Sequence, residues 1–179
     1  MDENEKIEEG KGSAVWEFVK VVVISVAIVL PIRAYIAQPF IVSGASMEPN
    51  FYNGEYLIVD ELTYELRPPE RREVVVFRYP LNPSEFFIKR VIGLPGEKVE
   101  IKSGKITING MELAEPYLPA DLETAPNVKM ELAESQYFVL GDNRPHSSDS
   151  RFWGVLPKEK LMGRALVRLW PIAKAGIIK

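Results

Sequence analysis

The longest apolar stretch in the chain lies near its N-terminus and predicts a helix. Residues 15–37 are mostly valine, isoleucine and alanine, and Val21–Leu30 carries no charge. A helix of this length reaches about 35 Å, which exceeds the roughly 30 Å hydrocarbon core of a bilayer. Trp16 and Tyr35, near its two ends, are typical of residues that anchor a helix at the membrane interface. The pattern therefore predicts a transmembrane helix over residues 15–37.

Other interpretations of this stretch fit less well. A cleaved signal peptide carries small residues two positions apart before the cut, whereas Ala34 and Ala37 are three apart. An interfacial amphipathic helix needs a polar face, but Ile24 and Ile28 continue the face that holds Lys20. A buried helix of a soluble protein is a further alternative. The transmembrane anchor is the favoured interpretation.

The charges around the stretch predict its orientation. Residues 1–14 are polar and acidic, with two glycines, and we expect a disordered tail there. The basic residues ahead of the apolar centre are Lys6, Lys11 and Lys20, whereas Arg33 is followed by no lysine or arginine until Arg67. Because cytoplasmic flanks carry the excess of Lys and Arg, the N-terminus is expected in the cytoplasm. Residues 38–179 would then form a domain on the outer face of the cytoplasmic membrane.

After Phe40 the pattern changes to short runs typical of β-strands. The runs are Glu55–Val59, Glu73–Tyr79, Phe86–Ile92, Lys98–Lys102, Lys105–Asn109, Gln136–Leu140 and Leu161–Leu169. Ser103-Gly104 and Asn109-Gly110 are turn signals that bracket a predicted hairpin, Val99–Ile108. The hairpin belongs to a short insertion at about 99–135, in which Pro116–Met130 is expected to be a surface loop. The fourteen prolines favour a mainly β domain with an irregular, coiled antiparallel sheet.

Composition narrows the chemistry. A net charge of −3 gives no support for a nucleic-acid partner. The absence of cysteine excludes disulfides, thiolate catalysis and cysteine-ligated metals. The chain has a single histidine and no obvious metal-binding motif, so no metal or organic cofactor is expected. If nucleophilic catalysis occurs here, a lysine is the residue best placed to drive it.

Ser46 and Lys89 are the candidate nucleophile and base. Ser46 lies in the turn-like segment Ser43–Pro49, and Lys89 lies in a strand between aromatic and aliphatic neighbours. A serine hydroxyl needs an adjacent base, and lysine can serve only when burial lowers its pKa. On an alternating strand, Phe87 and Val91 share the face of Lys89 and would disfavour an ammonium ion. Taken singly, an exposed strand lysine and a capping serine are the simpler interpretations.

A polar run, Gly141–Arg151, follows an apolar strand that ends at Leu140 and is suited to form the wall of a site. With this run, four blocks of the chain resemble the bacterial type I signal peptidases, which are membrane-anchored Ser/Lys endopeptidases. The blocks are Ser43–Pro49, Arg71–Phe77, Phe87–Gly96 and Gly141–Gly154, in the order of the family. The resemblance covers nearly the whole chain and implies a coiled antiparallel pseudo-barrel without a large accessory domain.

The resemblance assigns roles by position. It implies that Ser46 is the nucleophile, Lys89 the general base and Ser147 the serine that orients the lysine. Four residues match those that brace the site: Asp142, Arg90, Asp149 and Arg151. Gly44 stands where some members have a serine that donates to the oxyanion, so the Ser46 N–H and a second backbone or water donor would serve. Asn50 and Arg72 stand where the family usually has threonine and glycine.

The implied reaction is removal of N-terminal signal peptides from exported preproteins, after small residues in an Ala-x-Ala pattern. An extended substrate is expected to lie against Phe40, Ile41 and Val42 and against Phe87 and Ile88. His146 is expected to be a loop residue near the site. Two alternatives predict other features. A self-cleaving Ser/Lys repressor would have a DNA-binding domain and an Ala-Gly bond upstream of the serine, and an inactive partner-binding β-domain would lack Ser46 or Lys89.

Overall fold

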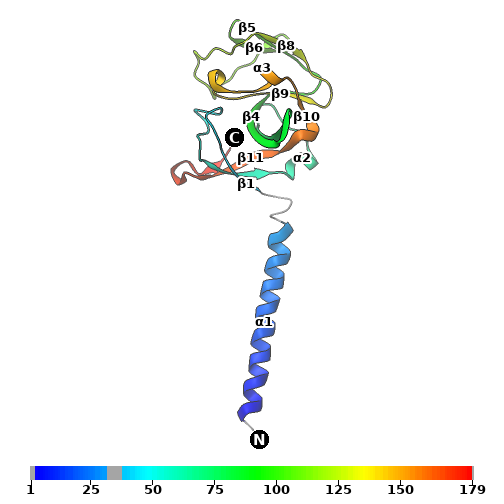
Figure 1. Ribbon diagram of the computed structural model, residues 1–179, viewed down its shortest axis with the longest axis vertical. Helices are drawn as coiled ribbons and strands as arrows, with labels where there is room; N and C mark the ends of the chain where they lie inside the picture. The colour runs from blue at the N-terminus through cyan, green and yellow to red at the C-terminus, as the bar shows by residue number, and fades with distance from the viewer. Residues whose placement is uncertain (1–2, 32–37, 179) are drawn as a thin grey trace. The chain divides into compact units, whose positions relative to one another are not determined.

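The computed structural model describes residues 3–31 and 38–178 and divides into two units, Met1–Ala37 and Gln38–Lys179. The first unit contains one helix, α1, Glu3–Pro31 (Figure 1). The helix therefore includes most of the segment in which a disordered tail was expected. Glutamate and lysine, which are frequent there, are good helix formers, and the two glycines cost only about 1 kcal/mol each.

The side chains of α1 are solvent-exposed from Ala14 to Val29, all around the helix. Lys20 pairs with Glu17 at 2.9 Å on this surface. No helix within the described segments meets the length and apolarity that a membrane crossing requires. The end of the predicted span, residues 32–37, lies outside the described residues, and the transmembrane helix stays a prediction.

The second unit is built on an antiparallel sheet of eight strands. Its order is β1 (Gln38–Ile41), β2 (Tyr56–Asp60), β11 (Leu161–Trp170), β3 (Val74–Tyr79), β4 (Asn82–Gly93), β9 (Gln136–Leu140) and β10 (Leu156–Pro157), with β12 (Gly176–Ile177) also paired to β11. Register shifts interrupt four of the strand pairs. These irregularities give the coiled sheet that the sequence predicted, because each bulge bends and twists its strand.

A smaller sheet follows β4 in the chain. Its order is β7 (Met111–Glu112), β6 (Lys105–Ile108), β5 (Lys98–Lys102) and β8 (Val128–Glu131). The predicted hairpin is confirmed, since Val99 pairs with Ile108 and the turn residues Ser103 and Gly104 both have positive φ. The expected loop Pro116–Met130 is wrong at its end, where Val128–Glu131 pairs with β5 and alternates in burial. The prolines at the beginning of the segment favoured a loop, so the sequence did not predict the short strand at its end.

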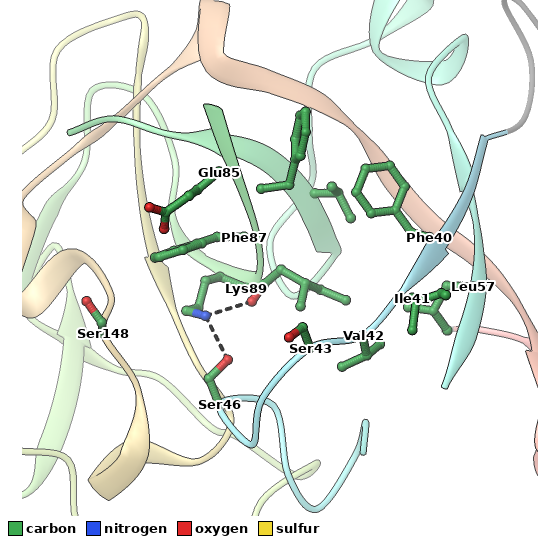
Figure 2. Close-up of a pocket in the computed structure, with 13 residues that line it drawn as sticks. Phe40, Ile41, Val42, Ser43, Ser46, Leu57, Glu85, Phe87, Lys89 and Ser148 are labelled. Carbon is green, nitrogen blue, oxygen red and sulfur yellow. Dashed lines mark hydrogen bonds between the residues drawn. The ribbon is translucent and has the colours of Figure 1, made fainter. Parts of the chain in front are cut away.

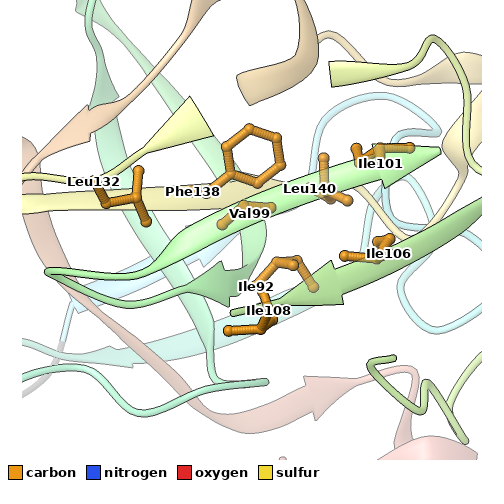
Figure 3. Packing of buried hydrophobic residues seen from close by; sticks show 8 residues of the cluster. All are labelled: Ile92, Val99, Ile101, Ile106, Ile108, Leu132, Phe138 and Leu140. Carbon is orange, nitrogen blue, oxygen red and sulfur yellow. The ribbon is translucent and has the colours of Figure 1, made fainter. Parts of the chain in front are cut away.

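Three clusters of buried side chains hold the second unit together. One fills the space between the smaller sheet and the strands β4 and β9, and its members are Ile92, Val99, Ile101, Ile106, Ile108, Leu132, Phe138 and Leu140 (Figure 3). The other two lie on the larger sheet, around Met47 and Phe51 and around Phe77 and Tyr137. Met47 and Phe51 belong to the turn that carries Ser46, so burial of their side chains fixes that turn against the sheet.

The helices of the second unit are short. They are α2 (Thr63–Leu66), α3 (Ser150–Trp153) and the 3-10 helices Arg144–His146, Lys158–Lys160 and Ile172–Lys174. The Asp149 side chain caps α3 by accepting from the Arg151 N–H at 3.2 Å. This cap fixes the end of the polar loop that follows β9.

Candidate active site

Ser46 and Lys89 meet in the structure, although 43 positions separate them in the chain. The Lys89 Nζ lies 2.8 Å from the Ser46 Oγ, within hydrogen-bond distance, and 2.9 Å from the carbonyl oxygen of Ile88. Figure 2 shows both contacts at one side of a cavity. The geometry is that of a nucleophile beside its base.

The strand β4 buries the Lys89 amine, because its alternation turns Phe87 and Lys89 to the same face. Lys89 is 4% exposed, and its Nζ lies 5.1 Å from the centroid of the Phe87 ring. Burial lowers the pKa of Lys89 to about 8, although the charges of Asp149 and Asp142 act in the opposite direction. A lysine with this pKa is neutral in a useful fraction near physiological pH, so it can accept a proton from a hydroxyl group.

Ser46 lies in a tight turn that follows the edge strand β1. Gly44 opens the turn at a φ of +86°, a conformation that favours glycine. The Gly44 N–H donates to the Asn53 Oδ1 at 2.9 Å and is therefore already engaged. No acceptor among the described residues pairs with the Ser46 N–H. That group is free to donate to a developing oxyanion.

The polar loop after β9 holds this turn from the other side. The Asn143 N–H donates to the Ser46 carbonyl and its Nδ2 donates to the Ala45 carbonyl, each at 3.0 Å. Gly141 packs so closely that a Cβ atom there would lie 2.4 Å from the Ser46 carbonyl oxygen. The nucleophile turn is thus clamped between its own buried side chains and the 141–143 backbone.

The four predicted bracing residues form two buried ion pairs. Asp142 receives two hydrogen bonds from Arg90, at 2.8 and 2.6 Å, and both side chains are almost fully buried. Asp149 receives two bonds of 2.8 Å from Arg151 and a further bond from the Gly141 N–H. Two-bond arginine–carboxylate pairs fix orientation as well as distance. The Arg90–Asp142 pair joins β4 to the loop after β9, and the Asp149–Arg151 pair fixes the loop internally.

Ser147 and Ser148 lie in this loop with different surroundings. Ser147 is buried, and its Oγ has no hydrogen-bond partner in the described part of the chain. Its predicted contact with Lys89 is therefore not made, and its lysine-orienting role stays a prediction. The exposed Ser148 lines the cavity beside Lys89 and was not anticipated (Figure 2). His146 is exposed, and it ends the 3-10 helix Arg144–His146 rather than lying in an irregular loop as expected.

The cavity beside the Ser/Lys pair has a volume of about 490 Å³. All five predicted substrate-contact residues line it: Phe40, Ile41, Val42, Phe87 and Ile88. β1 is an edge strand, and β9 covers the second edge of β4 only from Arg90 to Gly93. The cavity therefore has a strand with unpaired backbone on each side. Sequence reasoning missed Ser43, Leu57, Val76, Glu85 and Phe86 as further wall residues, because their place depends on sheet order.

Further residues around the site depend on contacts that span long separations in sequence. Arg144 is buried, pairs with Glu115, and donates from its Nε to the Gly141 carbonyl at 3.0 Å. Arg72 has a φ of +75°, and its carbonyl accepts from the Arg90 Nη1 at 2.9 Å. The family's usual glycine at the position of Arg72 was the one available signal. Among the described residues, no three acidic or histidine side chains gather in a way that could hold a metal ion.

Comparison with known proteins gives one consistent family. The model of the family described as "Signal peptidase, peptidase S26" matches residues 15–170. A probable signal peptidase I-2 of Synechocystis is 39% identical, over 98% of this chain and 83% of that protein. A signal peptidase I of Leptolyngbya laminosa is 40% identical, over 92% and 84% of the two chains. A crystal structure of a signal peptidase I from Enterococcus faecalis is 32% identical and matches with a TM-score of 0.49, over 55% of this chain and 97% of that one.

Proposed function

Because the chain belongs to the signal peptidase family, peptidase S26, we propose that it is a serine endopeptidase that removes N-terminal signal peptides from preproteins. The observation that carries the proposal is the 2.8 Å contact between the Lys89 Nζ and the Ser46 Oγ. A buried amine at this distance supplies the base that a serine hydroxyl needs, and no other base among the described residues makes a hydrogen bond with Ser46.

In the first half of the reaction, neutral Lys89 takes the proton of the Ser46 hydroxyl while the Oγ attacks the scissile carbonyl carbon. The ammonium then gives that proton to the departing amine as the peptide C–N bond breaks. The mature protein leaves, and the signal peptide stays attached to Ser46 as an ester. A lowered lysine pKa serves both steps, since it favours uptake of the proton and its return.

In the second half, water attacks the ester carbonyl and Lys89 takes a proton from that water. The proton returns to the Ser46 Oγ as the C–O bond breaks and the signal peptide leaves with a carboxylate. The oxyanion of each tetrahedral intermediate is stabilised by the Ser46 N–H, which has no other partner among the described residues. A second donor comes from water or another backbone group, because the Gly44 N–H is bonded to Asn53.

The substrate binds as an extended strand between β1 and β4. The unpaired edges of these strands offer backbone donors and acceptors, and such main-chain pairing gives affinity without demanding one sequence. The apolar wall residues around Val42 and Ile88 would contact apolar substrate side chains near the cut. This arrangement supports cleavage after the pattern Ala-x-Ala. It also makes preproteins with signal peptides the partners of the enzyme.

The proposal includes a single-pass anchor in the cytoplasmic membrane, with the N-terminus in the cytoplasm and the peptidase domain outside. Its support is the mostly apolar surface of α1 between Val15 and Val29, charged only at Glu17 and Lys20, together with Lys6 and Lys11 ahead of it. The cysteine-free chain allows a direct test, with Lys11→Cys and Lys102→Cys as single labelling sites. An impermeant maleimide added to intact cells is expected to label only the Lys102→Cys variant. Labelling of Lys11→Cys alone would reverse the orientation, and extraction of the protein by carbonate would exclude the anchor.

The function is tested by cleavage of a preprotein with an Ala-x-Ala site in detergent or liposomes. Wild type is compared with Ser46→Ala and Lys89→Ala, each checked for folding, and with a preprotein that carries leucine in place of both alanines. We expect cleavage after the second alanine by wild type only, and none of the leucine substrate. Cleavage that survives Lys89→Ala would exclude lysine as the base. A folded wild type that cuts no preprotein would favour the partner-binding alternative.

A further inference from the structure

Asn50 joins segments that are far apart in the chain. It belongs to the turn that carries Ser46, and its Nδ2 donates to the Asp142 Oδ2 at 2.8 Å and to the Tyr117 carbonyl at 3.0 Å. Its own carbonyl accepts from the Arg168 Nη2 at 2.6 Å. Asn50 thus connects the nucleophile turn with the loop after β9, the 113–127 segment and β11.

Asp142 extends this connection to the strand of the lysine. Its carboxylate, which accepts from Asn50, also accepts both hydrogen bonds of Arg90. Arg90 follows Lys89 on β4 and points to the opposite face of the strand. A continuous chain of three buried or half-buried side chains therefore links the backbone beside Lys89 to the turn of Ser46.

Tyr117 closes the arrangement on its remaining side. The guanidinium of Arg90 lies 4.1 Å from the centroid of the Tyr117 ring, and the carbonyl of the same residue accepts from Asn50. The side chain of Arg90 is thereby held between the Asp142 carboxylate and the Tyr117 ring, and Asn50 donates to that carboxylate and to the Tyr117 backbone. Loss of the Asn50 amide would leave a buried carboxylate oxygen and a carbonyl short of one donor each, which costs about 1–3 kcal/mol per group.

We propose that Asn50 is a positioning residue that sets the distance between the Ser46 hydroxyl and the Lys89 amine. The inference rests on the proposed function and names a residue through which that site is assembled. Asn50 does not line the substrate cavity; it lines a separate cavity of about 410 Å³ with Arg90 and Tyr117. Its loss is therefore expected to act on kcat and to leave KM nearly unchanged, because substrate contacts stay in place.

The Asn50 amide also affects the electrostatic potential at the Lys89 amine. The charged groups that act on Lys89 or share its cavity are Asp142, Asp149 and Glu85, and those around Asp142 are Arg90 and Arg144. The Asn50 amide offsets part of the Asp142 charge. When the amide is removed, the more negative potential stabilises the ammonium form and raises the pKa of Lys89. A lower melting temperature alone, with Lys89 still buried at the temperature of the assay, would not move this titration.

The experiment compares Asn50→Leu with Asn50→Thr and with Asn127→Leu, a matched change at an exposed asparagine of the smaller-sheet region. Preprotein cleavage gives kcat and KM, and pH-dependent acetylation of Lys89, followed by peptide mass spectrometry, gives its pKa without any turnover. We expect Asn50→Leu to lower kcat by about 10- to 100-fold, to change KM less than about twofold, and to raise the pKa of Lys89. Threonine, which keeps one donor, is expected to recover part of both losses, and Asn127→Leu to match wild type.

Two results would overturn the proposal. The first is a folded Asn50→Leu variant with the kcat and the Lys89 titration of wild type. The second is a loss of kcat with an unshifted Lys89 titration, a lowered melting temperature and no recovery by threonine, which would assign Asn50 to folding alone. Absence of cleavage by wild type would instead count against the proposed function, and the acetylation titration would still decide the link between Asn50 and Lys89.

Discussion

At the scale of single residues, the site depends on a lysine amine kept out of water. The folded chain holds Lys89 at a pKa of about 8, against about 10.5 for a solvated lysine. Between these two pH values the unfolded chain binds a proton that the folded chain does not. Stability from this group is therefore highest above pH 10.5, falls as the pH drops to 8, and stays at its minimum below 8. Burial of the base that supports catalysis costs stability at neutral pH.

This cost predicts the behaviour of Lys89→Met. The variant lacks the buried charge, so we expect it to be more stable than wild type. The gain in its free energy of unfolding over wild type should be largest at neutral pH. The advantage should shrink by about 3 kcal/mol between pH 8 and 10.5, which is the free energy of the shifted pKa. Urea unfolding at several pH values measures this difference. Lys102→Met, at an exposed lysine, serves as control, and an advantage independent of pH would show that Lys89 is not desolvated.

Gly141 predicts a second effect at this scale. A Cβ atom there would lie 2.2 Å from the Ser147 Oγ and 2.4 Å from the Ser46 carbonyl oxygen. We expect Gly141→Ala to displace the Ser46 turn and to lower kcat by about 100-fold or more. Gly110→Ala is the matched comparison, since Gly110 has a φ of +84° and open space around it. It should lower the melting temperature and spare kcat; an equal kcat in both variants would contradict the clamp.

The roles of these residues were predictable to different degrees. Ser46 and Lys89 could be paired because a chain with one histidine and no cysteine has few other bases to offer. The brace between Arg90 and Asp142 followed from family resemblance. Asn50 was marked by its departure from the family's usual threonine, but its partners could not be predicted, because only the folded chain brings Asp142 and Tyr117 to it.

At the scale of elements, one part of β4 borders the substrate cavity and the other part is fixed within the sheet. Its first part, Asn82–Lys89, pairs with β3 alone and offers its other edge to the cavity, whereas Arg90–Gly93 is paired on both sides. The lysine lies at the boundary between these two parts. It is thus fixed by the fully paired end of the strand and exposed to substrate at the open end.

The smaller sheet supplies stability to the strands of the site. Ile101 on β5 is 1% exposed and packs in the cluster that includes Ile92 of β4. We expect Ile101→Ala to lower the free energy of unfolding by about 2–5 kcal/mol, the usual cost of emptying a core position. Because Ile101 does not line the substrate cavity, kcat should stay close to wild type well below the melting temperature. Lys102→Ala is the exposed neighbour that controls for the strand, and a small loss of stability on Ile101→Ala would contradict the described core.

Elements with strong local signals were predictable. The hairpin Val99–Ile108 has turn residues that demand positive φ, and the strand runs alternate in polarity. β8 was missed because four residues at the end of a Pro-rich segment carry too little pattern to distinguish a strand from a loop. Helix α1 begins at Glu3, where composition favoured disorder over the helix-forming tendency of glutamate and lysine.

At the scale of the whole molecule, function follows from strand order. The sheet places β11 between β2 and β3 and places β4 beside β9. Ser46 precedes β2, Lys89 lies on β4 and the bracing loop follows β9, so this order brings three distant segments to one cavity. The three segments could be identified from the sequence. Their arrangement could not, because pairing between strands far apart in the chain produces no local sequence pattern. For this reason the cavity walls were only half predicted.

The central claim is that Lys89, with its lowered pKa, activates Ser46. The most direct measurement is the pH dependence of kcat/KM for wild-type cleavage of an Ala-x-Ala preprotein, with His146→Ala measured alongside. We predict a rate that rises with pH through an inflection near 8 and is unchanged by His146→Ala, because the neutral amine is the active form. An inflection near the histidine value of about 6.5 that disappears in His146→Ala would contradict the account and make His146 the base.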